Sequence, residues 1–254
     1  MTSDELKSYL DQKYSQYNSP EFIREDPILI PHRFSMKEDI EISAFLAAII
    51  AWGQRKTIIR NASKLVELMD DRPYDFLMHA HEDEFGRFSS FVHRTFNGID
   101  CQFFIKRLSQ LYRQSDGLEG TLGRMVAASG PCEGISAFKQ FFFSVPHQSR
   151  SEKHLADPLR GSSAKRINMF LRWMVRKDEG GVDFGIWKHI PQSMLSIPLD
   201  VHTGNVARSL GLLKRKQNDQ KAVMELDRKL REFDTDDPVK YDFALFGIGV
   251  YEDF

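Results

Sequence analysis

Apolar side chains recur every three or four residues along most of the chain, which is the spacing of helices that bury one face. The clearest case follows Ser35 and Glu38, which have the spacing of a capping box at the start of a helix. The apolar face of this helix consists of Ile42, Phe45, Leu46, Ile49 and Ile50. The same spacing predicts helices at 4–17, 36–52, 58–69, 101–112, 134–143 and 165–176.

The segments between these helices contain turn-forming residues and no sustained alternation of apolar and polar positions. Residues 27–31 are expected to form an extended connector, and residues 74–98 short helices and loops. Only residues 177–181 resemble a flexible break, and the sequence contains no internal repeat. The pattern therefore predicts an all-α fold.

A further apolar stretch changes to a helical pattern at Asp200. Pro198 disfavours a helix at the residue before it, and Asp200 is of a type favoured as an N-cap. Apolar positions then follow at helical spacing, at Val206, Leu210 and Leu213. Asp200 is therefore expected at the start of a helix. Taken alone, its carboxylate needs no role beyond accepting hydrogen bonds from the backbone N–H groups of the first turn.

The composition is that of an ordinary globular protein. The 254 residues are 41% hydrophobic and 28% charged, enough for one large domain or two small lobes. No run approaches the ~18 apolar residues of a membrane span, and the first residues lack the apolar core of a signal peptide. Cys101 and Cys132 are too few for a four-thiolate cluster or a disulfide framework. We therefore expect a cytoplasmic protein that has no iron–sulfur cluster and does not associate with membranes.

Positive charge is concentrated in two runs, although the formal net charge is only −1. Residues 150–177 contain eight Lys or Arg and two acidic residues, and residues 204–216 contain four Lys or Arg and no acidic residue. Asp200 lies between the two runs in the sequence. Together the runs could form one surface for the phosphates of a nucleic acid, or each could be an ordinary solvated face.

Three histidines, His79, His81 and His93, raise the question of a metal site. No carboxylate or third ligand stands at a matching spacing. An acidic run at 82–84 follows two of them directly. We therefore expect surface histidines and no bound metal.

Lys165 lies in the first turn of a predicted helix, directly after the turn-forming stretch that begins at Gly161. The positive end of the helix dipole disfavours an ammonium group there and so favours the neutral amine. A neutral lysine amine can attack an electrophilic carbon, whereas a charged one can contact a phosphate. The residues around Lys165 leave both roles open.

Two motifs carry a resemblance to a known family. Gly-x-x-x-Lys-x-x-Asn-x-x-Leu occupies 161–171, and Leu-Asp-Val-His-Thr-x-x-Val-x-Arg-x-Leu-Gly-Leu occupies 199–212. The chain thereby resembles the helix-hairpin-helix DNA glycosylase superfamily, which includes endonuclease III and the 8-oxoguanine glycosylases. It is also similar over most of its length to an uncharacterised bacterial family related to that superfamily, with 237–249 as a further similar stretch.

The resemblance implies an architecture. A single helical domain over residues 1–254 would consist of two closely packed lobes with a cleft between them. Residues 40–150 would form the central lobe. Residues 1–39 and 151–254 would form the second lobe, which would carry the hairpin and the Asp200 helix.

The resemblance also implies roles for individual residues. Lys165 matches the nucleophile of the superfamily, and Asp200 matches its essential carboxylate. Gln54 lies in a segment that resembles the one whose glutamine inserts into the duplex behind an extruded base. Contacts to DNA or substrate are expected from residues of the hairpin and of the two helices, namely Gly161, Ser163, Arg166, Arg172, His202 and Arg208.

Three features depart from the superfamily pattern. The hairpin has Gly161 but Ser163 where a second glycine usually lets a backbone N–H approach a phosphate. Residues 177–190 resemble an insertion relative to endonuclease III. The cysteines of the iron–sulfur members are missing, so the cluster-free 8-oxoguanine enzymes are the better analogues.

These expectations favour an enzyme of base-excision repair that acts on double-stranded DNA containing a damaged base. A carboxylate can stabilise the oxocarbenium-like sugar formed when an N-glycosidic bond breaks, and a neutral amine can capture its anomeric carbon and form a Schiff base. The expected function is a DNA glycosylase that removes a damaged, for example oxidised, base, with AP-lyase activity left open. The alternative is a catalytically inactive DNA-binding or scaffold protein, in which Lys165 contacts a phosphate and Asp200 only caps a helix.

Overall fold

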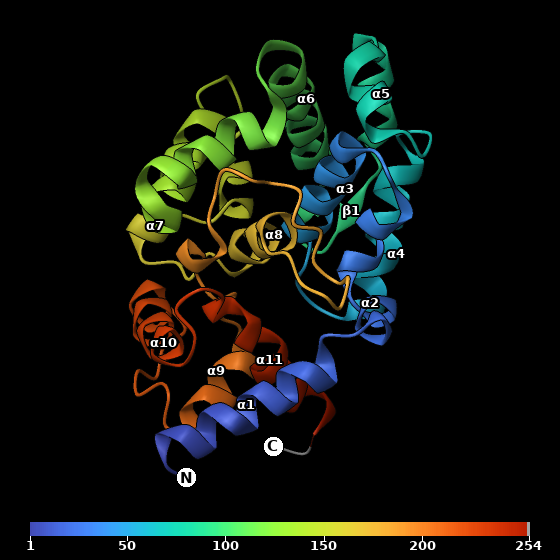
Figure 1. Cartoon of the computed structure of the whole chain (residues 1–254). Coiled ribbons are helices and arrows are strands. Elements are labelled where there is room, and N and C mark those ends of the chain that lie inside the picture. Colours follow the sequence, from blue (N-terminus) through green and yellow to red (C-terminus); the bar gives the residue numbers. More distant parts are fainter. Residues whose placement is uncertain (253–254) are drawn as a thin grey trace.

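Helices dominate the computed structural model, which describes residues 1–252 (Figure 1). The α-helices are α1 (Ser3–Tyr17), α2 (Pro20–Glu25), α3 (Lys37–Ile49), α4 (Arg55–Glu67), α5 (Pro73–His79), α6 (Gly98–Gln114), α7 (Arg124–Phe142), α8 (Lys165–Val175), α9 (Val201–Ser209), α10 (Gln220–Phe233) and α11 (Tyr241–Tyr251). The strands β1 (Val92–His93) and β2 (Phe96–Asn97) form a small antiparallel hairpin. The predicted all-α class is confirmed apart from this hairpin. Over residues 1–252, no helix combines the length and the apolar character needed to cross a membrane.

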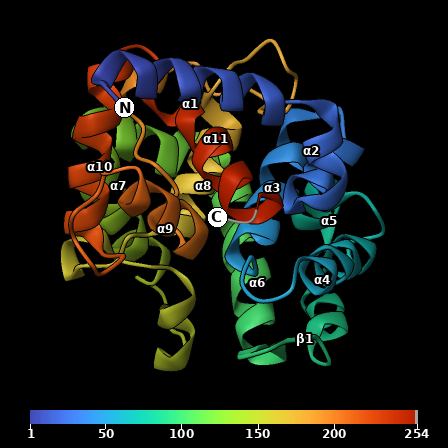
Figure 2. The ribbon, with the colours of Figure 1, turned by 90° about the horizontal axis from the view of Figure 1, so that it is seen from below.

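Buried apolar side chains form two clusters. The first consists mainly of residues from α3–α8 and the segment 22–30, and the second mainly of residues from α1, α9, α10 and α11. Figure 1 shows the four helices of the second cluster together below α8, and Figure 2 shows them from that side. The chain therefore forms two helical groups, with α8 at their junction.

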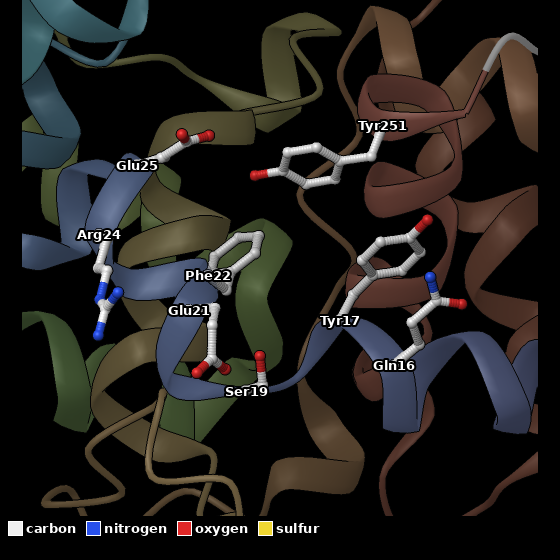
Figure 3. A pocket seen from close by; sticks show the side chains of 8 residues that line it. All are labelled: Gln16, Tyr17, Ser19, Glu21, Phe22, Arg24, Glu25 and Tyr251. Carbon is white, nitrogen blue, oxygen red and sulfur yellow. The ribbon is translucent and has the colours of Figure 1, made fainter.

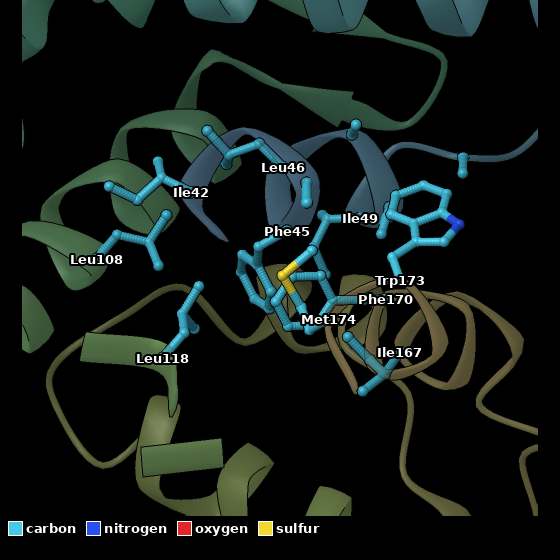
Figure 4. Packing of buried hydrophobic residues seen from close by; sticks show 14 of the residues in the cluster. Ile42, Phe45, Leu46, Ile49, Leu108, Leu118, Ile167, Phe170, Trp173 and Met174 are labelled. Atoms are coloured by element: carbon cyan, nitrogen blue, oxygen red, sulfur yellow. The ribbon is translucent and has the colours of Figure 1, made fainter. Parts of the chain in front are cut away.

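Helices α3 and α8 form the centre of the first cluster. Every residue of α3 from Ile40 to Ile49 is buried, as is α8 from Ile167 to Val175. Phe45 meets Phe170 edge-on with ring centroids 5.5 Å apart, and Ile49 and Trp173 lie beside this pair (Figure 4). This packing holds the first turn of α8 against the end of α3.

The packing of α8 differs from the predicted division into lobes. The segment 151–195 is expected in the second lobe, whereas Leu155, the apolar face of α8 and Trp187 all belong to the first cluster. The second cluster is completed by α1, which packs along α11. The physical reason is that α8 buries nearly its whole length, and α3 provides the matching apolar surface.

The start of α3 corrects a prediction. Ser35 and Glu38 do not form the expected capping box, because α3 begins at Lys37 with Met36 as the N-cap residue and without a side-chain cap. A capping box forms instead at α6, where Asn97 and Asp100 each accept a hydrogen bond from the backbone N–H of the other. The spacing of residue types identifies candidates for an N-cap, but the backbone conformation decides which residue becomes the N-cap.

Other local predictions also differ from the structure. Residues 27–31 do not form an extended connector, because Pro27–Leu29 form the 3-10 helix η1 and Pro31 starts another 3-10 helix. The predicted helix at 134–143 is the second part of α7, which is kinked at Gly130 (φ 85°). His93 is not a surface histidine, since only 1% of it is exposed.

Residues 177–181, which resemble a flexible break in the sequence, are tied to the protein by Asp178, which pairs with Arg176 at 2.6 Å. The rest of the insert-like stretch 177–190 is tied down as well. A β-bridge pairs Lys177 with Phe184, and the indole of Trp187 donates a hydrogen bond to Glu41 at 2.8 Å. Asp183 is buried against the arginines of α8. The segment therefore covers one side of α8 and joins it to α3.

Candidate functional site

A cavity of about 530 Å³ lies between the two helical groups. Its walls come from the end of α2, the α3–α4 turn, α4 and α8 on one side, and from the start of α9 and from α11 on the other. Lys165 and Asp200 both line it, although they are far apart in the sequence. The other lining residues are Asp26, Pro27, Ala51, Trp52, Gly53, Arg55, Ile58, Arg166, Met169, Leu199, Val201, His202, Asn218 and Phe246.

Lys165 is the first residue of α8, and the backbone before it is strained. Ala164 has a left-handed conformation (φ 46°, ψ 34°), which costs a residue with a Cβ about 1–2 kcal/mol. Such strain in a well-packed segment is typical of functional sites. The Lys165 ammonium lies 3.5 Å from the sulfur of Met169, one turn along the same face of α8. The side chain therefore extends along the cavity wall and not into bulk solvent.

Asp200 is the N-cap of α9, as the sequence predicts. Its Oδ1 accepts a hydrogen bond from the backbone N–H of Thr203 at 3.0 Å. Its backbone carbonyl accepts a hydrogen bond from the Asn218 side chain at 2.8 Å. Within residues 1–252, no hydrogen bond reaches the second carboxylate oxygen. The cap therefore fixes the orientation of the carboxylate and leaves one oxygen available to the cavity.

The hairpin that precedes α8 is tied to the start of α10 and to the segment that precedes α9. Gly161 has a left-handed conformation (φ 92°), and its carbonyl accepts a hydrogen bond from the backbone N–H of Gln220 at 3.1 Å. The Ser163 hydroxyl donates to the carbonyl of Leu199 at 3.4 Å. These contacts fix the position of Lys165 relative to Asp200. Neither Gly161 nor Ser163 lines the cavity.

Arg172 is not a surface residue, so the expectation that it contacts DNA is wrong. Only 3% of Arg172 is exposed. Its guanidinium donates to Asp183 at 3.3 Å and forms a close ion pair with Asp242. The positive charge is neutralised inside the protein, where it cannot reach a phosphate. Arg172 instead lies beneath Lys165, two turns further along α8.

The other predicted DNA contacts lie at or near the cavity. The Arg166 guanidinium donates to the backbone carbonyl of Ile49 and packs over the ring of Trp52, and burial lowers its pKa to about 10. His202 lines the cavity and donates from Nδ1 to the carbonyl of Gly249 at 3.0 Å. Gln54 is exposed beside the cavity, as the N-cap of α4.

Arg208 forms hydrogen bonds to the loop that follows α9, so its guanidinium is not a free surface cation. Its Nε donates to the carbonyl of Arg215 at 2.8 Å, and an Nη donates to the side chain of Asn218. Asn218 in turn holds the carbonyl of Asp200. Arg208 therefore acts on the site through Asn218.

Part of the positive charge of the two basic runs is neutralised by acidic residues of the protein. Arg172 and Arg176 are buried in ion pairs, and Arg150 is paired with the buried Asp100. Exposed cations remain at Lys153, Arg160 and Lys177 in the first run and at Lys214 and Lys216 in the second.

Two buried carboxyl groups near Lys165 are absent from the sequence prediction. Asp26 and Asp242 both line a second, much smaller cavity of about 20 Å³, together with Lys165, Arg172 and Asp200. Burial raises the pKa of both, that of Asp242 to about 6 even though Arg172 lowers it. The site therefore contains three carboxyl groups, and only tertiary structure brings them together.

Aromatic walls are also absent from the prediction. The backbone carbonyl of Trp52 accepts a hydrogen bond from His93 Nε2 at 3.1 Å, and the ring of Trp52 stacks on that of His154 with centroids 5.9 Å apart. Phe246 of α11 lies on the opposite side, and the centre of its ring is 4.9 Å from the Arg55 guanidinium. The sequence offers a weak signal for Trp52, which lies two residues before Gln54.

Another cavity, of about 360 Å³, lies at the surface between α1, α2 and the end of α11 (Figure 3). Phe22 lies at its back, and Tyr17 and Tyr251 stack on one side with ring centroids 5.6 Å apart. None of the residues predicted for the site lines it. Within residues 1–252, no group of three or more His, Cys, Asp or Glu side chains could hold a metal ion.

Comparison with known proteins identifies the family of the chain. No curated protein and no solved structure matches it. A family model described as "Protein of unknown function (DUF2400)" matches residues 26–251, which include every residue that lines the 530 Å³ cavity. Because this match covers most of the sequence, the chain belongs to the DUF2400 family.

Proposed function

We propose that the protein is a DNA glycosylase of base-excision repair, with Lys165 as the nucleophile and Asp200 as the essential carboxylate. One observation carries the proposal: an amine and a carboxylate from distant segments line the same cavity. The resemblance of 161–171 and 199–212 to the helix-hairpin-helix glycosylases gives these two residues the same roles. The proposed partner is double-stranded DNA that contains a damaged base.

The residues present can carry out the bond changes. The neutral Lys165 amine forms a bond to the anomeric carbon of the sugar while the bond from that carbon to the base breaks. The Asp200 carboxylate stabilises the positive charge that develops on the sugar. Loss of a proton from the attached nitrogen and opening of the sugar ring then give a Schiff base, which water hydrolyses.

The walls of the cavity suit an extruded base. At about 530 Å³ the cavity lies within the range of small-molecule sites. Trp52 and Phe246 offer aromatic surface, and enzymes that act on bases hold the extruded base by stacking and by hydrogen bonds. Arg55 and the exposed Lys56 place positive charge at the start of α4, beside Gln54. These cations would meet the phosphates that flank the extruded nucleotide.

One observation favours the inactive alternative. The hydrogen bond from Thr203 to Asp200 shows that this carboxylate has a structural role, which a scaffold protein would also need. A catalytic Asp200 has to use its second oxygen in addition. The two functions therefore predict different effects of the same substitution.

The test uses Lys165→Gln and Asp200→Asn with duplexes that carry oxidised, deaminated or alkylated bases, and with a duplex that carries an abasic site. Asparagine caps a helix as well as aspartate does, so Asp200→Asn should leave stability nearly unchanged. It should lower base excision about 10²–10³-fold, the usual cost of removing one preorganised electrostatic group. Lys165→Gln should abolish trapping to DNA by borohydride.

The matched control for Asp200 is Asp219, the N-cap of α10. Its Oδ1 accepts a hydrogen bond from the backbone N–H of Ala222 at 3.1 Å, which is the cap bond that Asp200 makes to Thr203, and its carboxylate also pairs with Arg215. Asp219 does not line the cavity, so Asp219→Asn should excise bases at the wild-type rate. A wild-type protein that binds duplex DNA but neither releases any base nor becomes trapped on DNA would contradict the glycosylase proposal and support the scaffold alternative.

A further inference from the structure

Asp26 is a buried carboxyl group with an unused oxygen at the candidate site. Only 7% of the residue is exposed. It is the N-cap of η1, and its Oδ1 accepts a hydrogen bond from the backbone N–H of Ile28 at 3.0 Å. In the part of the chain that the structure describes, no hydrogen bond reaches Oδ2. One oxygen is therefore fixed by the backbone, while the other is free to act.

The position of Asp26 connects it to both cavities. It lines the 530 Å³ cavity proposed for the base, and it also lines the 20 Å³ cavity beneath Lys165. The smaller cavity has room for about one water molecule. Its polar lining residues are Asp26, Lys165, Arg172, Asp200 and Asp242. Asp26 therefore borders both the cavity proposed for the base and the small cavity that Lys165 also lines.

The charges around the small cavity favour a bound proton. Three carboxyl groups, Asp26, Asp200 and Asp242, face the Arg172 guanidinium and the amine of Lys165, which the proposed mechanism uses in its neutral form. If all three carboxyl groups were ionised, the lining would carry a net negative charge in a buried place. Because an unpaired buried charge is costly, uptake of a proton is favoured.

Asp26 is the best placed of the three to donate that proton. Asp242 is committed to the Arg172 ion pair and also accepts from Thr203, 3.4 Å away. Asp200 has to be ionised to stabilise the sugar. Asp26 takes part in no ion pair within residues 1–252, and its burial raises its pKa in spite of the nearby Arg172, Lys165 and Arg55.

We propose that Asp26 is the general acid of the reaction, which protonates the departing base. This inference rests on the proposed glycosylase function. As the bond between the sugar and the base breaks, the O–H bond of Asp26 breaks and an N–H or O–H bond forms on the base. The Lys165 nitrogen, which bears one proton too many after attack on the sugar, returns a proton to the Asp26 carboxylate. The carboxyl group is thereby regenerated, and no other reactant is needed.

The test separates the departure of the base from the chemistry of Lys165. A general acid is needed only while a base is present, whereas borohydride trapping on a preformed abasic site needs only the Lys165 amine. Asp26→Asn keeps an oxygen that can accept the Ile28 N–H bond, so the cap is preserved. The variant should excise a neutral damaged base at least ~100-fold more slowly than the wild type, the lower end of the usual range for general acid catalysis. Its trapping on an abasic-site duplex should stay near the wild-type level, which also shows that the variant is folded.

Asp157 provides the matched control. Like Asp26, it precedes a proline and caps a 3-10 helix, and its Oδ1 accepts the Leu159 N–H at 3.1 Å. It does not line either of these cavities. Asp157→Asn should therefore match the wild type on both duplexes.

Three outcomes overturn the inference. If Asp26→Asn excises bases at the wild-type rate, Asp26 is not the acid. If the variant loses trapping on the abasic duplex as well, Asp26 is needed for the reactivity of Lys165 or for the stability of the fold, and not for protonation of the base. If Asp157→Asn slows base excision as much as Asp26→Asn does, the slower excision results from weakening the cap of a 3-10 helix and not from the loss of an acid. Failure of the glycosylase proposal looks different, because the wild-type protein itself would then be inactive on both duplexes.

Discussion

Replacement of Arg172 by methionine tests whether this cation is structural. Both Arg172 and Arg208 are expected from the sequence to contact DNA, and the structure separates them. Arg172 is buried between Asp183 and Asp242, with its guanidinium 4.2 Å from the centre of the Phe243 ring. Arg208 is half-buried and donates to a loop. Methionine retains much of the apolar stem in each case and removes the charge.

The expected cost follows from the partners that remain. Arg172→Met leaves the carboxylate of Asp242 buried without its cation, while Asp183 keeps Arg176. Removing one partner of a buried ion pair costs about 3–5 kcal/mol. Arg208→Met removes hydrogen bonds whose acceptors can be reached by water, at about 1 kcal/mol. For a chain of this size, 1 kcal/mol corresponds to roughly 2–4 °C in Tm, so Arg172→Met should lower Tm by about 10 °C and Arg208→Met by a few degrees.

Urea unfolding at several pH values measures both variants. Burial raises the pKa of Asp242 to about 6 even with Arg172 present, and removal of the cation raises it further. The carboxyl group of the variant therefore takes up a proton more readily, and the destabilisation should be largest above pH ~6 and shrink as the pH falls. Addition of Asp242→Asn to Arg172→Met should recover part of the lost stability at neutral pH, because it removes the unpaired charge.

Two results would refute this reasoning. If Arg172→Met costs no more than Arg208→Met, the buried ion pair contributes little to stability. If its cost does not depend on pH, Asp242 is not the group left unpaired. A large loss of DNA affinity by a fully stable Arg172→Met variant would restore the original surface interpretation.

The remaining predictions concern a buried carboxylate and the DNA surface. Burial raises the pKa of Asp227 from 3.8 to about 6, so its ionisation removes about 3 kcal/mol of stability as the pH rises through this range. Asp227→Asn can still accept the hydrogen bond from the Ile197 N–H. This variant should flatten the pH dependence of the free energy of unfolding between pH ~4 and ~6. An unchanged pH dependence would show that Asp227 is not the group that ionises in this range. Duplex affinity should fall steeply with salt, and Lys56→Gln and Arg160→Gln should each lower the slope of log affinity against log salt by about 1. Lys229→Gln, on α10 and paired with Glu232, should leave this slope unchanged.

Local patterns in the sequence were sufficient for several helices, such as α3 and α8, and for one cap, whereas α10 and α11 were not predicted. The apolar spacing at 42–50 predicts α3, and Asp200 caps α9 as its position after Pro198 suggests. Both depend on interactions within a few residues, which sequence spacing records directly. The capping box predicted at Ser35 is wrong, because Met36 and not Ser35 is the N-cap residue of α3, and no side chain caps this helix.

Charge and burial depended on segments that are distant in sequence. The run at 150–177 indicates a basic surface, yet Asp183 and Asp242 neutralise Arg172 from the following loop and from α11. Whether a charged residue is exposed depends on which acidic residues fold against it, and no local spacing encodes that. For the same reason, the sequence alone predicts three surface histidines, whereas His93 is buried behind Trp52.

The candidate site also combines features that depend on local sequence with features that depend on tertiary packing. The sequence by itself determined that Lys165 begins a helix and that Asp200 caps another, because both are properties of a single turn. Only the tertiary structure decided that the two residues share a cavity and that Asp26 joins them there. The reason is that α8 packs on α3 while α9 packs on α11, so the distance between their first turns is set by two apolar cores and not by the chain that connects them.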